Sequence, residues 1–111
     1  MGKFVLSKRS NGELQFNLVA DNSEIILTSE GYTSRAACEN GIASVKENSA
    51  RDDAFDRRES SNGKVYFNLK AKNFQVIGTS QMYESTSSME KGIQSVRNNA
   101  PKAEIVEAAQ A

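Results

Sequence analysis

Few side chains in this chain are suited to catalytic or metal chemistry. The chain contains no histidine, which removes the commonest general base and a common metal ligand. Its single cysteine, Cys38, could act as a nucleophile, but it lies on the apolar stripe of an expected helix. We therefore favour a buried, inert thiol. The sequence shows no CxxC pair, phosphate-binding glycine loop or nucleophile elbow, so we expect no catalytic residue, no cofactor and no enzymatic activity.

The densest run of charge spans residues 51–59 and contains three aspartates. Their carboxylates could hold a hard cation through oxygen ligands. The arginines between them favour a solvated link instead, with ion pairs that each contribute little. We therefore predict no metal site there, and the sequence leaves open whether this segment does more than join its neighbours.

One pair of asparagines and one pair of tyrosines recur at equivalent positions along the chain. By strand alternation, Asn17 and Asn68 point away from the apolar residues beside them, so they could form hydrogen bonds on an open surface. The favoured alternative is that both merely retain an ancestral residue or bond to a neighbouring loop. Tyr32 and Tyr83 each precede a helix, and we expect them to fill the junction between sheet and helix rather than to stack on a ligand.

A gapless duplication determines how all these residues are placed. Residues 4–50 and 55–101 carry the same pattern 51 positions apart, so that Ser10-Asn11-Gly12 recurs as Ser61-Asn62-Gly63. A unit of about 50 residues buries too little of its surface to be stable alone. We therefore expect one domain over residues 1–111, with repeat 1 at 3–51, repeat 2 at 54–107 and a shared core.

Each repeat predicts two strands around an Asn-Gly turn. A two-residue loop would place the apolar residues of the two strands on opposite faces. A three-residue loop with a left-handed Gly12 pairs Leu6 with Phe16 and so collects them on one face. We choose the three-residue loop, which in the second repeat pairs Arg57 with Phe67.

A second turn and a third strand follow in each repeat. We expect a left-handed backbone at Asn22 and Asn73, because asparagine tolerates it. The third strands, over 24–29 and 75–80, are apolar on both sides, and we place the recurring Ile26 and Ile77 inward. Alternation then puts Ile25, Leu27 and Val76 on the other face of the sheet. The alternative is that the third strands face the other way and these side chains are buried.

Helices are predicted over about 34–48 and 85–98. Ser34 and Ser85 are the expected N-caps, with a capping box from Ser87 as the alternative in the second helix. Gly41 and Gly92 lie in mid-helix, where glycine costs roughly 1 kcal/mol relative to alanine. A close approach of the helix to another element would explain them. Pro101 should end the second helix.

The tail at 104–107 reads as one more short strand. The segments Ser61–Ala71, Ser80–Tyr83 and Glu90–Val96 resemble the YegP-like family. The resemblance spans nearly the whole chain. It implies an α+β fold of two pseudo-symmetric β-β-β-α(-β) repeats, which form a single antiparallel sheet with both helices on one face and exchange their terminal strands. It implies no activity, because the family is a domain of unknown function.

Composition limits the partners that we expect. Fourteen basic and fourteen acidic residues cancel, which gives no strong field for a polyanion or an anionic membrane. The apolar run at the N-terminus is too short for a signal peptide or a membrane span, so we expect a soluble, cytoplasmic protein.

The favoured function is a non-enzymatic interaction module that uses its open sheet face or an edge strand. Its partner would be another protein or, through weak self-association, a second copy. The candidate surface residues are Asn17, Ile25, Leu27, Tyr66, Asn68, Phe74 and Val76. The alternative is weak single-stranded nucleic-acid binding, with Tyr66 stacking on bases between Lys64, Arg57 and Lys70. The neutral net charge makes nucleic acid the less favoured partner.

Overall fold

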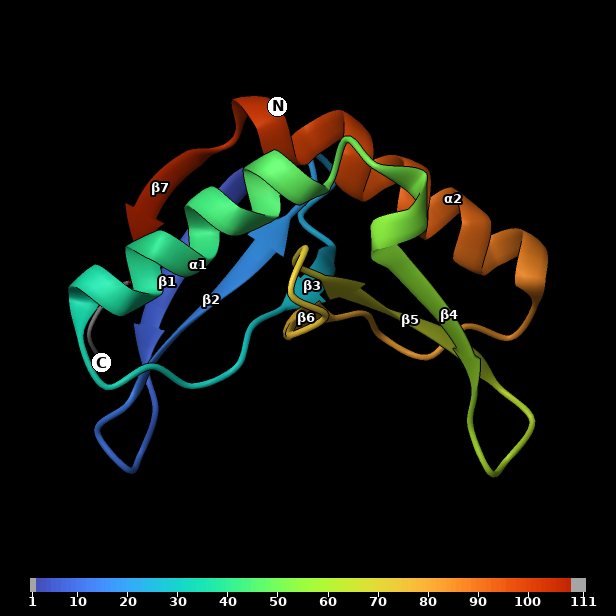
Figure 1. The fold of residues 1–111 in the computed structure, drawn as a ribbon, viewed down its shortest axis with the longest axis horizontal. Helices are drawn as coiled ribbons and strands as arrows, with labels where there is room; N and C mark the ends of the chain where they lie inside the picture. The colour runs from blue at the N-terminus through green and yellow to red at the C-terminus, as the bar shows by residue number, and fades with distance from the viewer. Residues whose placement is uncertain (1, 109–111) are drawn as a thin grey trace.

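Seven strands form one sheet, and two helices cover one of its faces, in a computed structural model that describes residues 2–108 (Figure 1). The strands are β1 (Lys3–Lys8), β2 (Leu14–Val19), β3 (Ile25–Thr28), β4 (Phe55–Glu59), β5 (Val65–Lys70), β6 (Val76–Thr79) and β7 (Glu104–Glu107). The helices are α1 (Arg35–Asn48) and α2 (Thr86–Asn99), followed by the 3-10 turns η1 (Asp52–Ala54) and η2 (Ala100–Lys102). The strand order β4-β5-β6-β3-β2-β1-β7 places the repeats side by side and confirms the α+β fold.

The hairpin register agrees with the three-residue loop. Leu6 is paired with Phe16, and Arg57 is paired with Phe67 in the second repeat. In the first loop the Gly12 N–H donates to the Arg9 carbonyl at 2.9 Å, and Gly12 has a φ of 89°. Glycine adopts this left-handed conformation without strain. The apolar residues of β1 and β2 therefore meet on the face that the helices cover.

The assignment of Leu27 to the open face is wrong, because β3 does not alternate regularly. Leu18 pairs with Leu27 and Val19 pairs with Ile25, so Ile26 is the extra residue of a β-bulge. Leu27 therefore shares the helix-covered face with Leu18 and is 1% exposed. Ile26 is buried as predicted, and Ile25 stays on the open face, where it is 47% exposed.

The same bulge in β6 joins the two repeats. Leu69 pairs with Gly78, so Gly78 also lies on the helix-covered face. A Cβ on Gly78 would lie only 2.6 Å from Cγ of Leu27, which shows that the leucine side chain fills the space above the glycine. β3 and β6 are paired at Thr28 and Thr79. The buried side chains of both repeats belong to one cluster, as the size of each repeat predicts.

The prediction of a left-handed backbone at the asparagine of the second turn is also wrong. The left-handed residues are Ser23, with a φ of 70°, and Phe74, with a φ of 68°. Asn22 and Asn73 instead accept a hydrogen bond through Oδ1 from the backbone N–H two residues later, at 3.1 Å in both repeats. This side-chain bond closes the turn without a left-handed asparagine and moves the strained conformation to the next residue.

The helices begin at the predicted caps. Oγ of Ser34 accepts a hydrogen bond from the Ala37 N–H, and Oγ of Ser85 accepts one from the Ser88 N–H, both at 3.1 Å. Ser85 therefore caps α2, and the alternative capping box from Ser87 is not used. α2 ends at Asn99, just before Pro101, as expected.

The mid-helix glycines make room for the two tyrosines. A Cβ on Gly41 would lie 2.7 Å from Cζ of Tyr32, and a Cβ on Gly92 would lie 2.6 Å from Cζ of Tyr83. Each tyrosine ring also stacks on a buried phenylalanine of its own repeat, at centroid distances of 6.1 and 6.4 Å. This arrangement confirms that the tyrosines fill the sheet–helix junction.

Each strand that follows a helix pairs with the other repeat, which confirms the exchange. β4 follows α1 and pairs with β5, and β7 follows α2 and pairs with β1. The β1–β7 pair is parallel, so the sheet is mixed rather than wholly antiparallel. The reason is that α2 ends beside the start of the chain, where a Cβ on Gly2 would lie 3.0 Å from Cβ of Asn99. β7 therefore starts where β1 starts and runs in the same direction (Figure 1).

The Gly92 contact predicts an unusual response to alanine. In an isolated helix, Gly92→Ala would add about 1 kcal/mol of stability. Here the new methyl group meets the Tyr83 ring, and we expect the free energy of unfolding to fall by about 1–3 kcal/mol. Urea unfolding measures this, with Gln94→Ala on the exposed side of α2 as the control. A gain in stability from Gly92→Ala would contradict the packing.

Candidate functional site

The sheet face opposite the helices carries one continuous row of paired residues. We call this face the open face and the row the central row. In sheet order from β7 to β4, the central row consists of Val106, Val5, Asn17, Thr28, Thr79, Asn68 and Asp56. The four residues at its middle are polar and are related in pairs by the duplication. The structure thus places the two candidate asparagines in one row, with Thr28 and Thr79 between them.

The two threonines of the central row were not among the predicted site residues. Thr28 and Thr79 form the pair that joins β3 to β6, and each is half-buried. The recurrence of Thr-Ser at 28–29 and 79–80 was the available signal. It carried no information about the contact between repeats, because that contact depends on the strand order.

The two asparagines differ in their hydrogen bonding. Oδ1 of Asn68 accepts a hydrogen bond from the Thr79 hydroxyl at 2.8 Å. Oδ1 of Asn17 is shielded from solvent and has no partner among the described residues. An acceptor left in this state costs about 1–3 kcal/mol. Asn68 therefore has a structural role, whereas Asn17 retains an unused acceptor at the middle of the open face.

Apolar side chains flank the central row. Ile25 and Val76 occupy equivalent positions next to the bulges, and Ile25 is the more exposed. Tyr66 is half-buried and lies opposite Arg58 on the β4–β5 hairpin. Phe74 lies apart from the row in the β5–β6 turn and is 81% exposed. Of the predicted surface residues, only Leu27 belongs to the core.

Cys38 has the environment of a structural thiol. Its side chain is buried in the core cluster under α1. Burial raises the pKa of the Cys38 thiol, and the nearby Arg35 only partly opposes that shift. Since the thiolate is the reactive form, this environment disfavours nucleophilic chemistry.

The aspartates of the 51–59 segment are all engaged by cationic side chains. Their ion pairs join Asp52 to Arg57 at 3.1 Å, Asp53 to Arg51 at 3.2 Å, and Asp56 to Arg58 at 2.7 Å. Within residues 2–108, no three His, Cys, Asp or Glu side chains come together as a potential metal site. The carboxylates that could have formed such a site are therefore engaged in ion pairs instead.

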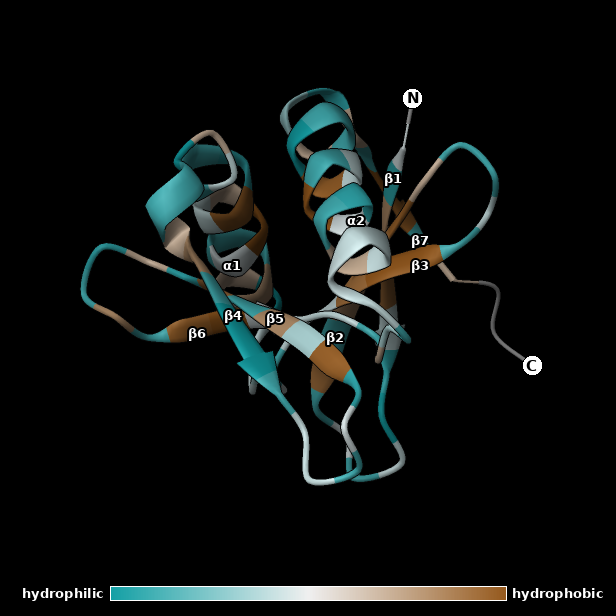
Figure 2. Cartoon of the chain, turned by 90° about the vertical axis from the view of Figure 1, so that its right-hand side faces the viewer, coloured by the Kyte–Doolittle hydropathy of each residue, from teal (hydrophilic) through white to brown (hydrophobic). Residues whose placement is uncertain are grey.

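Arg57 ties the edge strand β4 to α2. Its Nε and Nη2 donate to the two carboxylate oxygens of Glu90 at 2.5 and 3.0 Å. The hydrogen bond from Arg57 lowers the pKa of Glu90, while the partial burial of the Glu90 carboxylate opposes the shift. Beyond Phe55, β4 is strongly hydrophilic along its length (Figure 2). Charges along an edge strand discourage the addition of another strand, so the β4 edge is a poor candidate surface.

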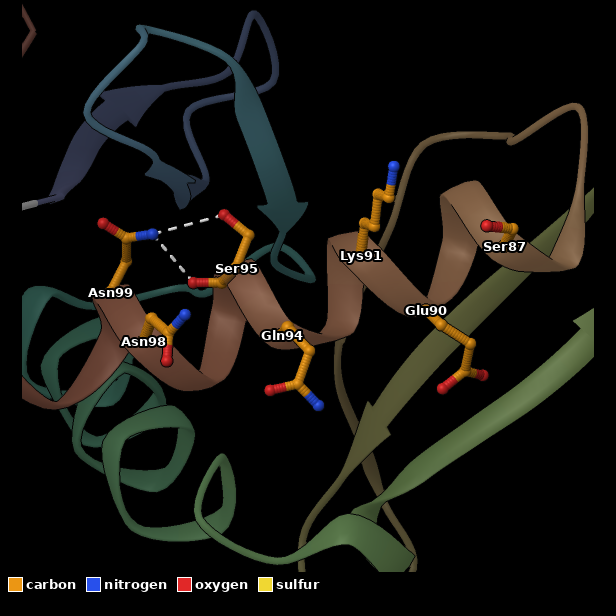
Figure 3. A pocket seen from close by; sticks show the side chains of 7 residues that line it. All are labelled: Ser87, Glu90, Lys91, Gln94, Ser95, Asn98 and Asn99. Carbon is orange, nitrogen blue, oxygen red and sulfur yellow. Dashed lines mark hydrogen bonds between the residues drawn. The ribbon is translucent and has the colours of Figure 1, made fainter.

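A shallow hollow also runs along the exposed side of α2, and Figure 3 shows the side chains that line it. Glu90 is held by Arg57, and Nδ2 of Asn99 donates to Ser95. In Figure 3, Lys91 and Gln94 point to different sides of the helix. These groups do not converge on a common point and form no site.

Within the described residues, neither helix has the length and apolar character needed to cross a membrane.

Comparison with known proteins identifies close relatives over most of the chain. The family model named "Domain of unknown function (DUF1508)" matches twice, at residues 10–56 and 60–107. The UPF0339 protein YegP of Shigella flexneri is 54% identical over 98 residues, which cover 88% of this chain and 89% of that protein. The solution NMR structure of E. coli YegP, described as a protein of unknown function, has a TM-score of 0.93 at 47% identity and covers 99% of this chain and 95% of that one. A UPF0339 protein from Shewanella oneidensis has a TM-score of 0.90 at 47% identity, with 96% and 90% covered.

The unequal asparagines predict unequal effects of the same substitution. Asn68→Val removes the bond to Thr79, and we expect it to lower the free energy of unfolding by about 1 kcal/mol. Asn17→Val removes an acceptor without a partner, so stability should stay the same or rise. Urea unfolding of the two variants makes the comparison, with each serving as the matched control for the other. Equal losses would contradict the assigned roles.

The Arg57 cluster predicts a dependence of stability on pH. The hydrogen bond from Arg57 lowers the folded-state pKa of Glu90. The stabilisation from Glu90 is therefore complete above its unfolded pKa of about 4, and it is lost as the pH falls through the lower folded value. Arg57→Gln should cost about 0.5–1 kcal/mol at pH 7 and reduce the loss of stability between pH 5 and 3. Urea unfolding at several pH values tests this against Lys72→Gln, and an unchanged pH profile for Arg57→Gln would refute it.

Proposed function

The chain belongs to the DUF1508 family, whose function is unknown, and we propose that it is a non-enzymatic module that binds a protein partner through its open face. The observation that carries this proposal is the central row, which crosses both repeats and holds the unused acceptor of Asn17. Because this oxygen is shielded from solvent, a partner reaches it only by shifting the side chains that cover it, and a hydrogen bond donated to it then removes the cost of leaving it unpaired. Binding thereby gains free energy that the isolated fold does not have.

The flanking side chains indicate the chemistry of the partner. Ile25 and Val76 offer apolar contacts beside the central row. The charged groups around Asp56 are already paired, because Arg58 and Lys70 lie 2.7 and 3.1 Å from its carboxylate. The partner surface therefore presents an N–H or O–H donor between apolar side chains and carries little charge. Such a mixture is typical of the centre of a protein interface.

The reactive groups of the chain support binding rather than catalysis. Cys38 is buried and its thiol pKa is raised. The aspartates of the 51–59 segment are held in ion pairs. None of these groups combines exposure with the shifted pKa that a general acid, general base or nucleophile requires.

The alternative of nucleic-acid binding gains no support from the geometry. Lys64 lies 3.1 Å from Glu84, and Lys70 lies 3.1 Å from Asp56. Arg57 is held by Glu90 on the helix-covered side. The basic groups around Tyr66 are therefore neutralised locally, and little electrostatic attraction for phosphates is left.

The proposal predicts that two changes on the open face abolish binding without unfolding the protein. Tyr66→Ala removes an aromatic contact, and Val76→Glu places a charge on an apolar flank. We expect both variants to retain the circular dichroism spectrum of the parent. The amount of partner protein that they capture from the native cell extract should fall at least tenfold. Quantitative mass spectrometry compares the captures, with Gln94→Ala on α2 as the matched control.

Light scattering of the purified protein distinguishes a different protein from a second copy. A captured protein that the control retains and both variants lose supports the proposal. Capture that is unaffected by the variants, or self-association without any captured protein, overturns it.

A further inference from the structure

A small basic hollow lies between the segment that follows α1 and the β5–β6 turn. Three cationic side chains and one carboxylate line it, which gives the lining a net charge of two positive units. It encloses about 160 Å³. This is below the range of about 300–1,000 Å³ that is usual for sites enclosing a whole ligand, so the hollow can take one group of a ligand whose remainder lies outside. The lining residues are Arg51, Asp53, Ala54, Lys70, Ala71, Lys72 and Phe74.

The equivalent positions of repeat 1 have a different chemistry. Asp21 and Ser23 stand where repeat 2 has Lys72 and Phe74. The other three polar positions of the lining, Arg51, Lys70 and Asp53, correspond to Lys102, Val19 and Glu104. The net charge is therefore negative in repeat 1 and positive in repeat 2. Both repeats nevertheless form the same turn, with the same left-handed residue and side-chain bond, so the fold does not require the basic and aromatic set.

The charge of Arg51 is only partly compensated within the described chain. Its Nη2 donates to Oδ1 of Asn48 at 2.9 Å, which fixes the orientation of the guanidinium. Its carboxylate partner, Asp53, lies 3.2 Å from Nη1 and is 82% exposed, so this pair contributes little. Nε is shielded from solvent and has no hydrogen-bond partner among residues 2–108. An anion in the hollow can therefore replace the exposed carboxylate of Asp53 at the guanidinium.

The two lysines of the hollow are compensated to different degrees. Lys70 lies 3.1 Å from the carboxylate of Asp56. Lys72 approaches Glu47 only at 4.0 Å, and both of these side chains are largely exposed. An exposed pair of this kind contributes little. An anion in the hollow therefore draws mainly on Arg51 and Lys72, while Lys70 adds to the positive field.

Phe74 presents an aromatic ring to a ligand at the same place. Its side chain is 81% exposed, and its backbone φ of 68° is strained for a bulky residue. Phenylalanine therefore gives the fold neither burial nor a relaxed backbone at this position. A nucleobase stacks on an exposed aromatic ring whatever its sequence, because every base has a π-face.

We propose that the hollow holds the phosphate of a mononucleotide whose base stacks on Phe74. A phosphate monoester carries a charge of about −1.5 to −2 at pH 7, which matches the net charge of the lining. Arg51 and Lys72 donate charge-assisted hydrogen bonds to its oxygens. Each phosphate within a nucleic-acid strand carries a single negative charge, so the hollow favours a free mononucleotide over a strand.

This site does not depend on the function proposed above. Neither the acceptor of Asn17 nor the apolar flanks of the central row belong to the lining of the hollow. The two proposals can therefore fail separately.

Titration of the intact protein with adenosine monophosphate, followed by heteronuclear NMR, tests the assignment. We expect saturable shifts of the backbone amides of Arg51, Lys72 and Phe74. Adenosine and inorganic phosphate each lack one half of the contacts, so each should bind at least tenfold more weakly. Lys72→Asp, which installs the residue of repeat 1, should weaken binding of the nucleotide at least tenfold. Phe74→Ser should weaken it to a similar extent and leave the affinity for inorganic phosphate unchanged.

Matched variants and probes separate this site from the rest of the surface. Lys64→Gln removes a lysine from the other end of β5, and Tyr66→Ala removes the aromatic ring of the open face. Both should bind the nucleotide as the parent does, and loss of binding in either overturns the proposal. It also fails if adenosine binds as tightly as the nucleotide, or if Lys72→Asp and Phe74→Ser, with the circular dichroism spectrum of the parent, bind it as the parent does.

Two further probes test the identity of the occupant. An unphosphorylated adenine pentanucleotide carries internal phosphates only, and a phosphotyrosine peptide joins a phosphate monoester to a different ring. Both should bind more weakly than adenosine monophosphate. Tighter binding of either probe would assign the hollow to a nucleic-acid strand or to a phosphorylated protein and would overturn the mononucleotide.

Discussion

The junction of β3 and β6 is the contact on which the rest of the molecule depends. Leu27 fills the space above Gly78 on one side of this junction, and Thr28 pairs with Thr79 on the other. α1 packs against β6 and α2 packs against β3, so each helix covers the third strand of the other repeat. Neither repeat can bury its apolar residues alone, because the helix above its third strand belongs to its neighbour. The hydrophobic gain is therefore available only to both repeats together.

This dependence also explains where the candidate surfaces lie. The central row passes from one repeat to the other at Thr28 and Thr79, and a hollow between α1 and the β5–β6 turn is likewise lined by both repeats. Both surfaces exist only in the assembled pair. Duplication supplied two equivalent copies of each position, and the two hollows between the repeats then diverged, with Gln75 in one where Glu24 stands in the other. The shared core allows this, since exposed turn residues can change without disturbing the buried junction.

Local signals predicted the parts of the structure that local chemistry controls. The left-handed Gly12, the caps Ser34 and Ser85 and the strand at 104–107 each follow from a short stretch of sequence. The face of the sheet on which Leu27 lies did not follow from the sequence. Three successive apolar residues conceal the β-bulge that shifts the alternation. Gly78, at the equivalent position, was the available hint, since a glycine within a strand often marks a bulge or a close contact. The hollows between the repeats and the placing of both asparagines in one row could not be predicted, because they depend on contacts between residues of different repeats.

Native-state hydrogen exchange of the whole chain tests the central claim that the two repeats form one cooperative unit. The slowest amides of the β1–β2 and β4–β5 hairpins should exchange with the same free energy of opening, equal to that of global unfolding. They should also share the same dependence on denaturant, because loss of the β3–β6 junction exposes both halves of the core. One hairpin that opens with a clearly lower free energy while the other remains protected would show two independent units and would contradict the account.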